Sequence, residues 1–163
     1  MKTCVVVADR SRARLFVSAP SAERYGVDNP GQELIEVEAL TDPEGELTGQ
    51  QLFSSTRSGS NRSPHGAAFE YDDRRQSHRD EEERRFAKRI AEAVRARLAT
   101  DRPQKLILAI EPQLLGMLRQ ALNGQLQQTL EVVELAKDFS WHTPQHVQAA
   151  LERCGAMTKA KPH

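Results

Sequence analysis

The stretch Lys105-Leu106-Ile107-Leu108-Ala109-Ile110-Glu111-Pro112-Gln113-Leu114-Leu115 joins an unbroken apolar run to a proline at an early helical position. A continuous apolar run of this length, followed by a helix signal, is typical of a strand that is buried on both faces of a sheet. Proline is favoured in the first turn of a helix, and Asn123-Gly124 supplies an end signal. The stretch therefore predicts a central strand followed by a helix that covers the sheet.

The residues before this stretch predict three more strands. A β-branched run at residues 3–8 is followed by a turn at 9–11 and a second apolar segment at 12–18, which together indicate a hairpin. Residues 34–40 alternate between apolar and acidic side chains, which indicates a strand with one buried face. That face is predicted to carry Ile35, Val37 and Ala39.

Helices are predicted between and after the later strands. The sequence Ser77-His78-Arg79-Asp80 resembles a capping box, and apolar residues then recur every four positions from Phe86 to Leu98. Residues 130–135 indicate a short strand, and Thr143 is placed to cap a last helix that ends before Gly155. The order predicts an α/β fold: a mixed β-sheet flanked by helices, in one domain over residues 1–155, with residues 156–163 as a disordered tail.

Composition narrows the functional classes. The chain has 163 residues, of which 38% are hydrophobic, which suits one core of moderate size. Basic and acidic residues number 23 each, so an electrostatic function has to be local. No stretch approaches the roughly 20 apolar residues that span a bilayer, and no signal peptide is recognised, so a cytoplasmic protein is expected. Cys4 and Cys154 are interpreted as buried thiols.

The long segment at residues 54–79 is the feature that indicates a surface task. It contains five arginines and two histidines but almost no aliphatic side chains, and it predicts one long polar loop. Guanidinium, hydroxyl and amide groups are typical contacts of phosphate. The residues predicted to bind RNA are Arg57, Arg62, His65, Arg74, Arg75 and Gln76. The alternative interpretation is a solvated loop whose arginines only keep it soluble.

Other chemical signatures are weak. The sequence has no Gly-rich phosphate loop, no nucleophile elbow and no Cys-x-x-Cys pair. His65 and His78 flank three acidic residues, but their spacing matches no established site, so neither a metal nor a cofactor is predicted. Trp141, the sole tryptophan, is expected to anchor the last helix against the core.

Three stretches together resemble the host attachment protein family. They are Val5-Val6-Val7-Ala8-Asp9-Arg10-Ser11-Arg12-Ala13-Arg14-Leu15-Phe16, Arg85-Phe86-Ala87, and Ala109-Ile110-Glu111-Pro112-Gln113-Leu114-Leu115-Gly116-Met117-Leu118-Arg119, followed by Lys137-Asp138. The resemblance implies a fold related to the central domain of archaeal and eukaryotic class-one translation release factors. In those factors a long loop carries Gly-Gly-Gln; here the loop contains only Gln76, without adjacent glycines.

Three functions follow as hypotheses. The first is a binding module that presents its arginine-rich loop to RNA, either tRNA or ribosomal RNA. The second is a peptidyl-tRNA ester hydrolase in which Gln76 or His65 orients water. The third, implied by the family's name, is a protein-interaction factor in the attachment of bacteria to host cells. No catalytic residue is assigned, and the sequence leaves the oligomeric state open.

Overall fold

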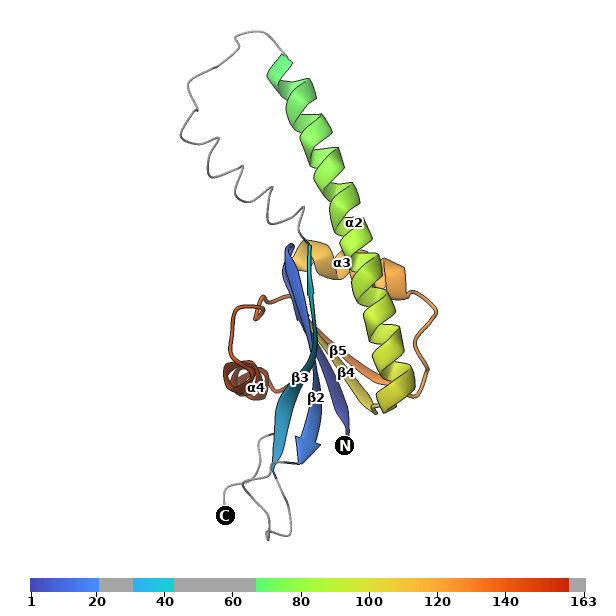
Figure 1. Ribbon diagram of the computed structural model, residues 1–163, viewed down its shortest axis with the longest axis vertical. Helices are drawn as coiled ribbons and strands as arrows, with labels where there is room; N and C mark the ends of the chain where they lie inside the picture. The colour runs from blue at the N-terminus through green and yellow to red at the C-terminus, as the bar shows by residue number, and fades with distance from the viewer. Residues whose placement is uncertain (21–30, 43–66, 159–163) are drawn as a thin grey trace.

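The computed structural model describes residues 1–20, 31–42 and 67–158, with the side chains of the long helix described from Arg74 onward. Five strands and three helices occur in the described part of the chain (Figure 1). In chain order they are β1 (Thr3–Ala8), β2 (Arg12–Pro20), β3 (Gln32–Thr41), α2 (Ala67–Asp101), β4 (Lys105–Ile110), α3 (Pro112–Leu122), β5 (Glu131–Leu135) and α4 (Pro144–Arg153).

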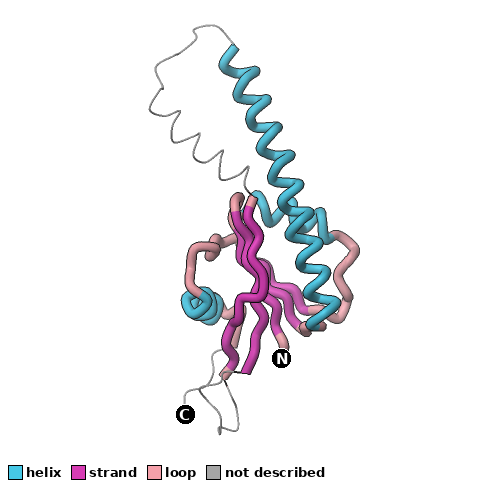
Figure 2. The backbone as a smooth tube through the Cα atoms, in the orientation of Figure 1, coloured by secondary structure: helices cyan, strands magenta, loops and turns pink. Residues whose placement is uncertain are grey.

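The strands form one mixed sheet in the order β3-β2-β1-β4-β5 (Figure 2). β1 pairs in parallel with β4, and β4 in parallel with β5. β2 is antiparallel to both β1 and β3, as the predicted hairpin requires. All six residues of β1 are buried, as are Leu106 to Ile110 of β4, because both strands are covered on both faces. The predicted α/β class is confirmed.

Helices cover the two faces of the sheet in different ways. α2 and α3 pack on one face, where Phe86, Ile90 and Val94 meet alternate residues of β1 and β4. α4 packs on the other face through Val147 and Leu151 (Figure 1). Because side chains alternate along a strand, one central strand supplies both layers of the core.

The ends of the two shorter helices follow the predicted signals. The carboxylate of Glu111 accepts hydrogen bonds from the backbone N–H groups of Gln113 and Leu114 at the start of α3. The Thr143 hydroxyl accepts from the backbone N–H of His146 at the start of α4. After α4, Gly155 takes a φ of 74°, a left-handed conformation that glycine adopts without strain.

The predicted tail boundary is wrong by at least two residues. Ala156 and Met157 are buried in the core layer beneath α4, and the Ala156 N–H donates to the Leu151 carbonyl. The left-handed turn at Gly155 directs the chain back to the helix, and burying these two side chains offsets the cost of ordering them. The last residues, 159–163, lie outside the described part.

The expected buried face of β3 is only partly confirmed: Val37 packs against the core, but Ile35 and Ala39 are exposed. The register with β2 shifts between Leu15, which faces Glu38, and Phe16, which faces Glu36, so a β-bulge interrupts the strand. A bulge changes which side chains point to which face. Leu34 is therefore buried, whereas Ile35 is 45% exposed.

The largest correction concerns the predicted loop at residues 54–79. Helix α2 begins at Ala67, not at the capping-box sequence near Ser77, so the second half of the predicted loop is helical. The apolar periodicity begins only at Phe86, and a helix that extends beyond the core carries no such periodicity. Local pairs of residues four apart support the extension, including His78 with Glu82 and Arg85 with Glu81.

Candidate functional site

Helix α2 projects beyond the sheet as a helical arm, defined here as residues 67–82 (Figure 1). None of its described side chains, from Arg74 to Glu82, is buried, and the first buried residues along the helix are Glu83 and Phe86. At 1.5 Å per residue the arm is roughly 24 Å long. It therefore offers a surface that can meet a large partner without disturbing the core.

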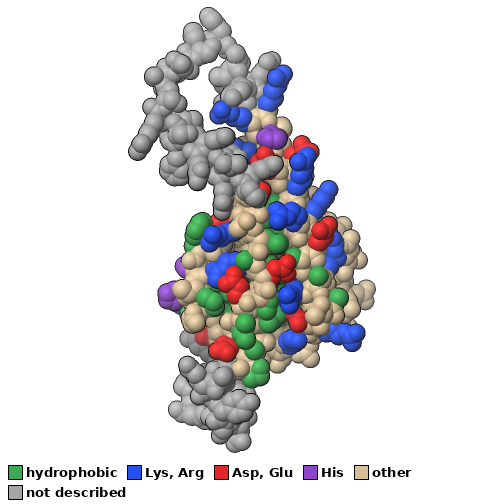
Figure 3. Space-filling view, in the orientation of Figure 1, with side chains coloured by type: hydrophobic (Ala, Val, Ile, Leu, Met, Phe, Trp, Pro, Cys, Tyr) green, Lys and Arg blue, Asp and Glu red, His purple; other side chains and the backbone are tan. Residues whose placement is uncertain are grey.

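One side of α2 carries a cationic face, defined here as Arg74, Arg84 and Lys88. All three side chains are exposed, and Figure 3 shows basic side chains along this helix. At 100° per residue they lie within about 80° of one another, on the side turned away from the core. Within the described part of the chain, none of the three has an ion-pair partner.

Acidic residues on the same side only partly balance these charges. Glu81 is paired with Arg85 at 2.9 Å, which neutralises both groups. Glu92 is exposed farther along the helix. Other arginines of α2 are engaged in the body of the protein: Arg89 donates to the Thr41 carbonyl, and Arg97 lies 3.8 Å from Glu38. The cationic face therefore keeps an excess of positive charge that the fold does not use.

The base of the arm is tied to the carboxyl ends of β1 and β4 by a polar network. The Gln76 amide donates to Asp80 Oδ1 at 3.1 Å, and the Gln113 amide donates to the same oxygen at 3.2 Å. Arg10 Nη2 in turn donates to Gln113 Oε1 at 3.0 Å. Gln76, a predicted site residue, is thus linked through two side chains to the turn after β1.

Arg10 also faces two carboxylates in this network. Its Nε lies 3.5 Å from Glu83 Oε1 and 3.8 Å from Glu111 Oε2. Glu83 is only 6% exposed, and its Oε2 has no hydrogen-bond partner among the described residues. Burial raises the pKa of Glu83; Arg10 opposes this shift, whereas Glu111 and Asp80 add to it. The ion pairs and the Gln113 hydrogen bond together fix the direction of the Arg10 side chain.

Asp9 organises the other side of the same edge. Its Oδ1 accepts from the backbone N–H groups of Ser11 and Arg12, and its Oδ2 accepts from the Ser140 hydroxyl and from Trp141 Nε1. Burial would raise the pKa of Asp9, but these hydrogen bonds outweigh it and lower the pKa below the ordinary value. The loop after β5 is therefore fastened to the end of β1.

The stretches that carry the family resemblance meet at this edge. Asp9 and Arg10 follow β1, Glu111 and Gln113 follow β4, and Asp138 follows β5 and accepts from the Ser140 backbone. These residues are too far apart in the sequence for local pattern reading to join them. Strand order could have predicted this cluster, because parallel strands bring their carboxyl ends to one edge of the sheet. Open α/β sheets bind ligands at that edge.

The structure divides the predicted RNA-binding residues into two groups. Arg57, Arg62 and His65 lie outside the described residues, so their prediction stays untested. Arg74, Arg75 and Gln76 are exposed on α2, and their assignment to a loop is wrong because the helix begins before them. Arg84 and Lys88 were not predicted as binding residues, because the sequence analysis used this helix only for the apolar residues that face the core.

Two smaller expectations are corrected. Trp141 does not anchor the last helix in the core, because 69% of it is exposed and its N–H is bonded to Asp9. Cys154 is exposed, since it follows the last turn of α4, whereas Cys4 is buried in β1 as expected. Burial raises the pKa of the Cys4 thiol to about 12.

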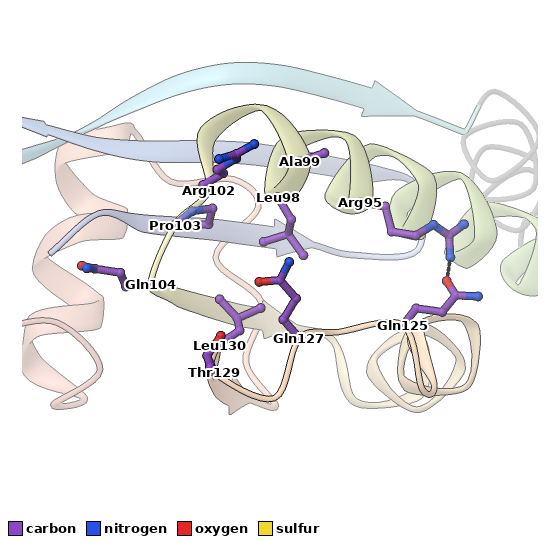
Figure 4. A pocket seen from close by; sticks show the side chains of 10 residues that line it. All are labelled: Arg95, Leu98, Ala99, Arg102, Pro103, Gln104, Gln125, Gln127, Thr129 and Leu130. Carbon is purple, nitrogen blue, oxygen red and sulfur yellow. Dashed lines mark hydrogen bonds between the residues drawn. The ribbon is translucent and has the colours of Figure 1, made fainter.

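A hollow of about 760 Å³ lies at the opposite edge of the sheet, between the end of α2 and the segment before β5 (Figure 4). Arg95 is hydrogen-bonded to Gln125 across one end of it. Arg74, Arg75 and Gln76, the predicted site residues that the structure describes, do not line this hollow. Its walls are formed by Arg95, Leu98, Ala99, Arg102, Pro103, Gln104, Gln125, Gln127, Thr129 and Leu130.

These features define an α/β domain in which a mixed sheet supports a projecting helix with unpaired cations, above a polar network at the strand ends. The chain belongs to the family described as protein required for attachment to host cells, whose model matches residues 4–151. The resemblance stated from the sequence motifs is thereby confirmed. A comparison with curated proteins found no match. Among the described residues, no helix has the length and apolar character needed to cross a membrane.

Proposed function

We propose that this protein is an RNA-binding module that uses the cationic face of α2 to contact the phosphate backbone. The observation that carries the proposal is the set of exposed charges at Arg74, Arg84 and Lys88, which have no ion-pair partner in the described part of the chain; Arg74 lies on the helical arm, and Arg84 and Lys88 lie on the next turns of α2. Phosphate contacts of this kind position an RNA without reading its sequence. The expected partner is a structured cellular RNA, such as tRNA or ribosomal RNA.

The distribution of charge restricts any contact with a polyanion to a local surface. The whole chain has a formal net charge of zero, so its overall field does not draw it to RNA. The contact therefore depends on a local cluster, and each phosphate neutralised on a single strand contributes about 0.7 to the slope of log affinity against log salt. A handful of such contacts gives binding that is strong at low salt and weak at high salt.

The relation to release factors and the family's role in attachment both bear on this proposal. A relation to the central domain of release factors would place the segment before α2 near RNA, and that relation stays a prediction. The family's description names attachment to host cells, and an RNA-binding protein would influence attachment indirectly, through the expression of other proteins. Arg57 and Arg62, which precede α2 in the sequence, would add to the same contact surface.

The test compares two variants that lose equal charge. The cationic-face variant carries Arg74→Gln, Arg84→Gln and Lys88→Gln. The control carries Lys2→Gln, Arg102→Gln and Arg153→Gln, which removes three charges from other elements of the fold. Glutamine at position 102 has the same β-carbon as arginine, so the φ of 46° there is no more strained than before.

Binding is measured by the fluorescence anisotropy of labelled tRNA and ribosomal RNA fragments at low salt. The cationic-face variant is expected to bind at least about tenfold more weakly than the wild type, because three phosphate contacts are lost. The control is expected to bind within about twofold of the wild type. Equal losses in the two variants would show that only net charge matters, and no loss in either would place the contact elsewhere.

A further inference from the structure

The Trp141 side chain is exposed at the surface, whereas a tryptophan that stabilises a fold is usually buried. Its side chain is the most exposed of the large apolar residues that the structure describes, at 69%. Leaving an indole in water forgoes the stabilisation that its burial would supply. The position therefore calls for an explanation outside the fold itself.

The indole is nevertheless held in place. Its Nε1 donates to Asp9 Oδ2 at 2.9 Å, and Asp9 is itself anchored by the backbone N–H groups of Ser11 and Arg12. The neighbouring Ser140 is fully buried and donates to the same Asp9 oxygen at 3.0 Å. A ring that is already fixed loses little conformational freedom when a partner binds to it.

One face of the ring carries a cation. The guanidinium carbon of Arg12 lies 4.1 Å from the centroid of the Trp141 ring. Arg12 is also opposite Thr41 in the β2–β3 register, and the Thr41 carbonyl accepts from Arg89 of α2. The described contacts place Arg12, and not Arg89, against the Trp141 ring.

The surroundings favour a charged partner over an apolar one. Arg12 covers one face of the indole, whereas Arg10 at the same strand end is held by Glu83 and Glu111. The other exposed large apolar residues that the structure describes lie elsewhere: Met1 is at the opposite end of β1, Ile35 is opposite Val17, well away from Arg12 along β2, and Val132 is on β5 opposite Leu106. A protein-binding surface centred on a tryptophan would normally include more apolar area.

We propose that Trp141 is a stacking platform for an unpaired nucleobase of the bound RNA, with Arg12 beside it to contact an adjoining phosphate. This inference rests on the proposed RNA-binding function and adds a specific contact to it. An aromatic ring stacks on any base, and a nearby arginine strengthens the contact. The ligand class is therefore single-stranded RNA, or an unpaired segment of a folded RNA.

The sole tryptophan provides its own probe. Short single-stranded oligoadenylate, labelled at one end, is titrated with the full chain at low salt while tryptophan fluorescence and label anisotropy are recorded together. Stacking is expected to quench the fluorescence in step with the anisotropy rise. Trp141→Ala is expected to weaken binding by between about fivefold and a hundredfold, and Trp141→Phe, which keeps an aromatic ring, by less. Circular dichroism checks that both variants are folded.

The outcomes separate this inference from the proposed function. If the anisotropy rises while the fluorescence stays constant, and Trp141→Ala binds like the wild type, RNA binding stands and the platform is overturned. In that case the exposed indole would be assigned to contact with a protein partner instead. If neither signal changes with oligoadenylate while labelled tRNA still binds, the platform is overturned and the phosphate contact stands; if neither RNA binds, both proposals are overturned. If quenching accompanies binding but the cationic-face variant binds normally, the platform is supported and the proposed phosphate contact is the part that fails.

Discussion

The two faces of helix α2 differ in what the fold requires of them. On the core face, Phe86, Ile90 and Val94 are buried against the sheet, and their removal would leave cavities. On the cationic face, Arg74, Arg84 and Lys88 are exposed and unpaired in the part of the chain that the structure describes. The same helix thus separates residues that maintain the fold from residues that the fold does not use. Unused charge on a projecting helix is the main reason to assign this surface a binding role.

Glu83 is a charged residue on the core face of α2. It is on the buried side of α2 but carries a carboxyl group; Arg10 lies 3.5 Å from it, and Arg79 also acts to lower its pKa. Its presence shows that the base of the arm is polar although it is enclosed. Burying a carboxylate costs free energy unless its partners compensate for the lost hydration.

The largest effect is expected on the core face. Ile90→Ala removes a fully buried side chain from the contact with the sheet and should lower the free energy of unfolding by about 2–5 kcal/mol. Urea denaturation followed by circular dichroism measures this change. A loss below about 1 kcal/mol would mean that α2 is not packed on the sheet as described.

A smaller effect of opposite sign is expected at Glu83. The pKa of Glu83 is raised in the folded protein, so its ionisation disfavours the folded state as pH rises from the ordinary glutamate value through the raised one. Glu83→Gln removes this ionisation and should raise the melting temperature at neutral pH. The difference should shrink as the pH falls below the ordinary glutamate pKa, where the wild-type carboxyl group is protonated in both states.

Thermal unfolding at several pH values decides between two roles for Glu83. A variant that is less stable than the wild type at neutral pH would show that the contact with Arg10 supports the fold. It would also mean that the cost of burial is smaller than the pKa shift indicates.

The smallest effect on stability is expected on the cationic face. The variant with Arg74→Gln, Arg84→Gln and Lys88→Gln should unfold within about 0.5 kcal/mol of the wild type, because exposed substitutions without partners change little. Denaturation curves recorded alongside those of Ile90→Ala give the contrast directly. A loss comparable to that of Ile90→Ala would show that these side chains stabilise the fold. Weaker RNA binding by this variant could then be due to unfolding rather than to the loss of phosphate contacts.

Much of the fold was predictable because its signals are local. The apolar run of β4, the helix starts at Glu111 and Thr143, and the stripe from Phe86 along α2 each depend on neighbouring residues. The start of α2 was not predictable in this way, since the arm has no apolar stripe. The exposure of Ile35 depends on a bulge, which the alternation of β3 does not reveal.

The candidate site was predictable only in part. Arg74 was singled out from composition, although it lies on a helix rather than a loop. The network that joins Arg10, Glu83 and Gln113 depends on three segments distant in sequence, and only the strand order places them together. Trp141 was misread because a sole tryptophan is more often buried, and its hydrogen bond to Asp9 is not encoded by any local pattern.

The measurement that tests the account most directly is the salt dependence of RNA affinity. The logarithm of the binding constant for single-stranded RNA is plotted against the logarithm of salt concentration for the wild type and for the cationic-face variant. If Arg74, Arg84 and Lys88 each neutralise one phosphate, the slope for the variant should be shallower by about 2, at roughly 0.7 per contact. Identical slopes for the two proteins would contradict the assignment of this helix face to RNA.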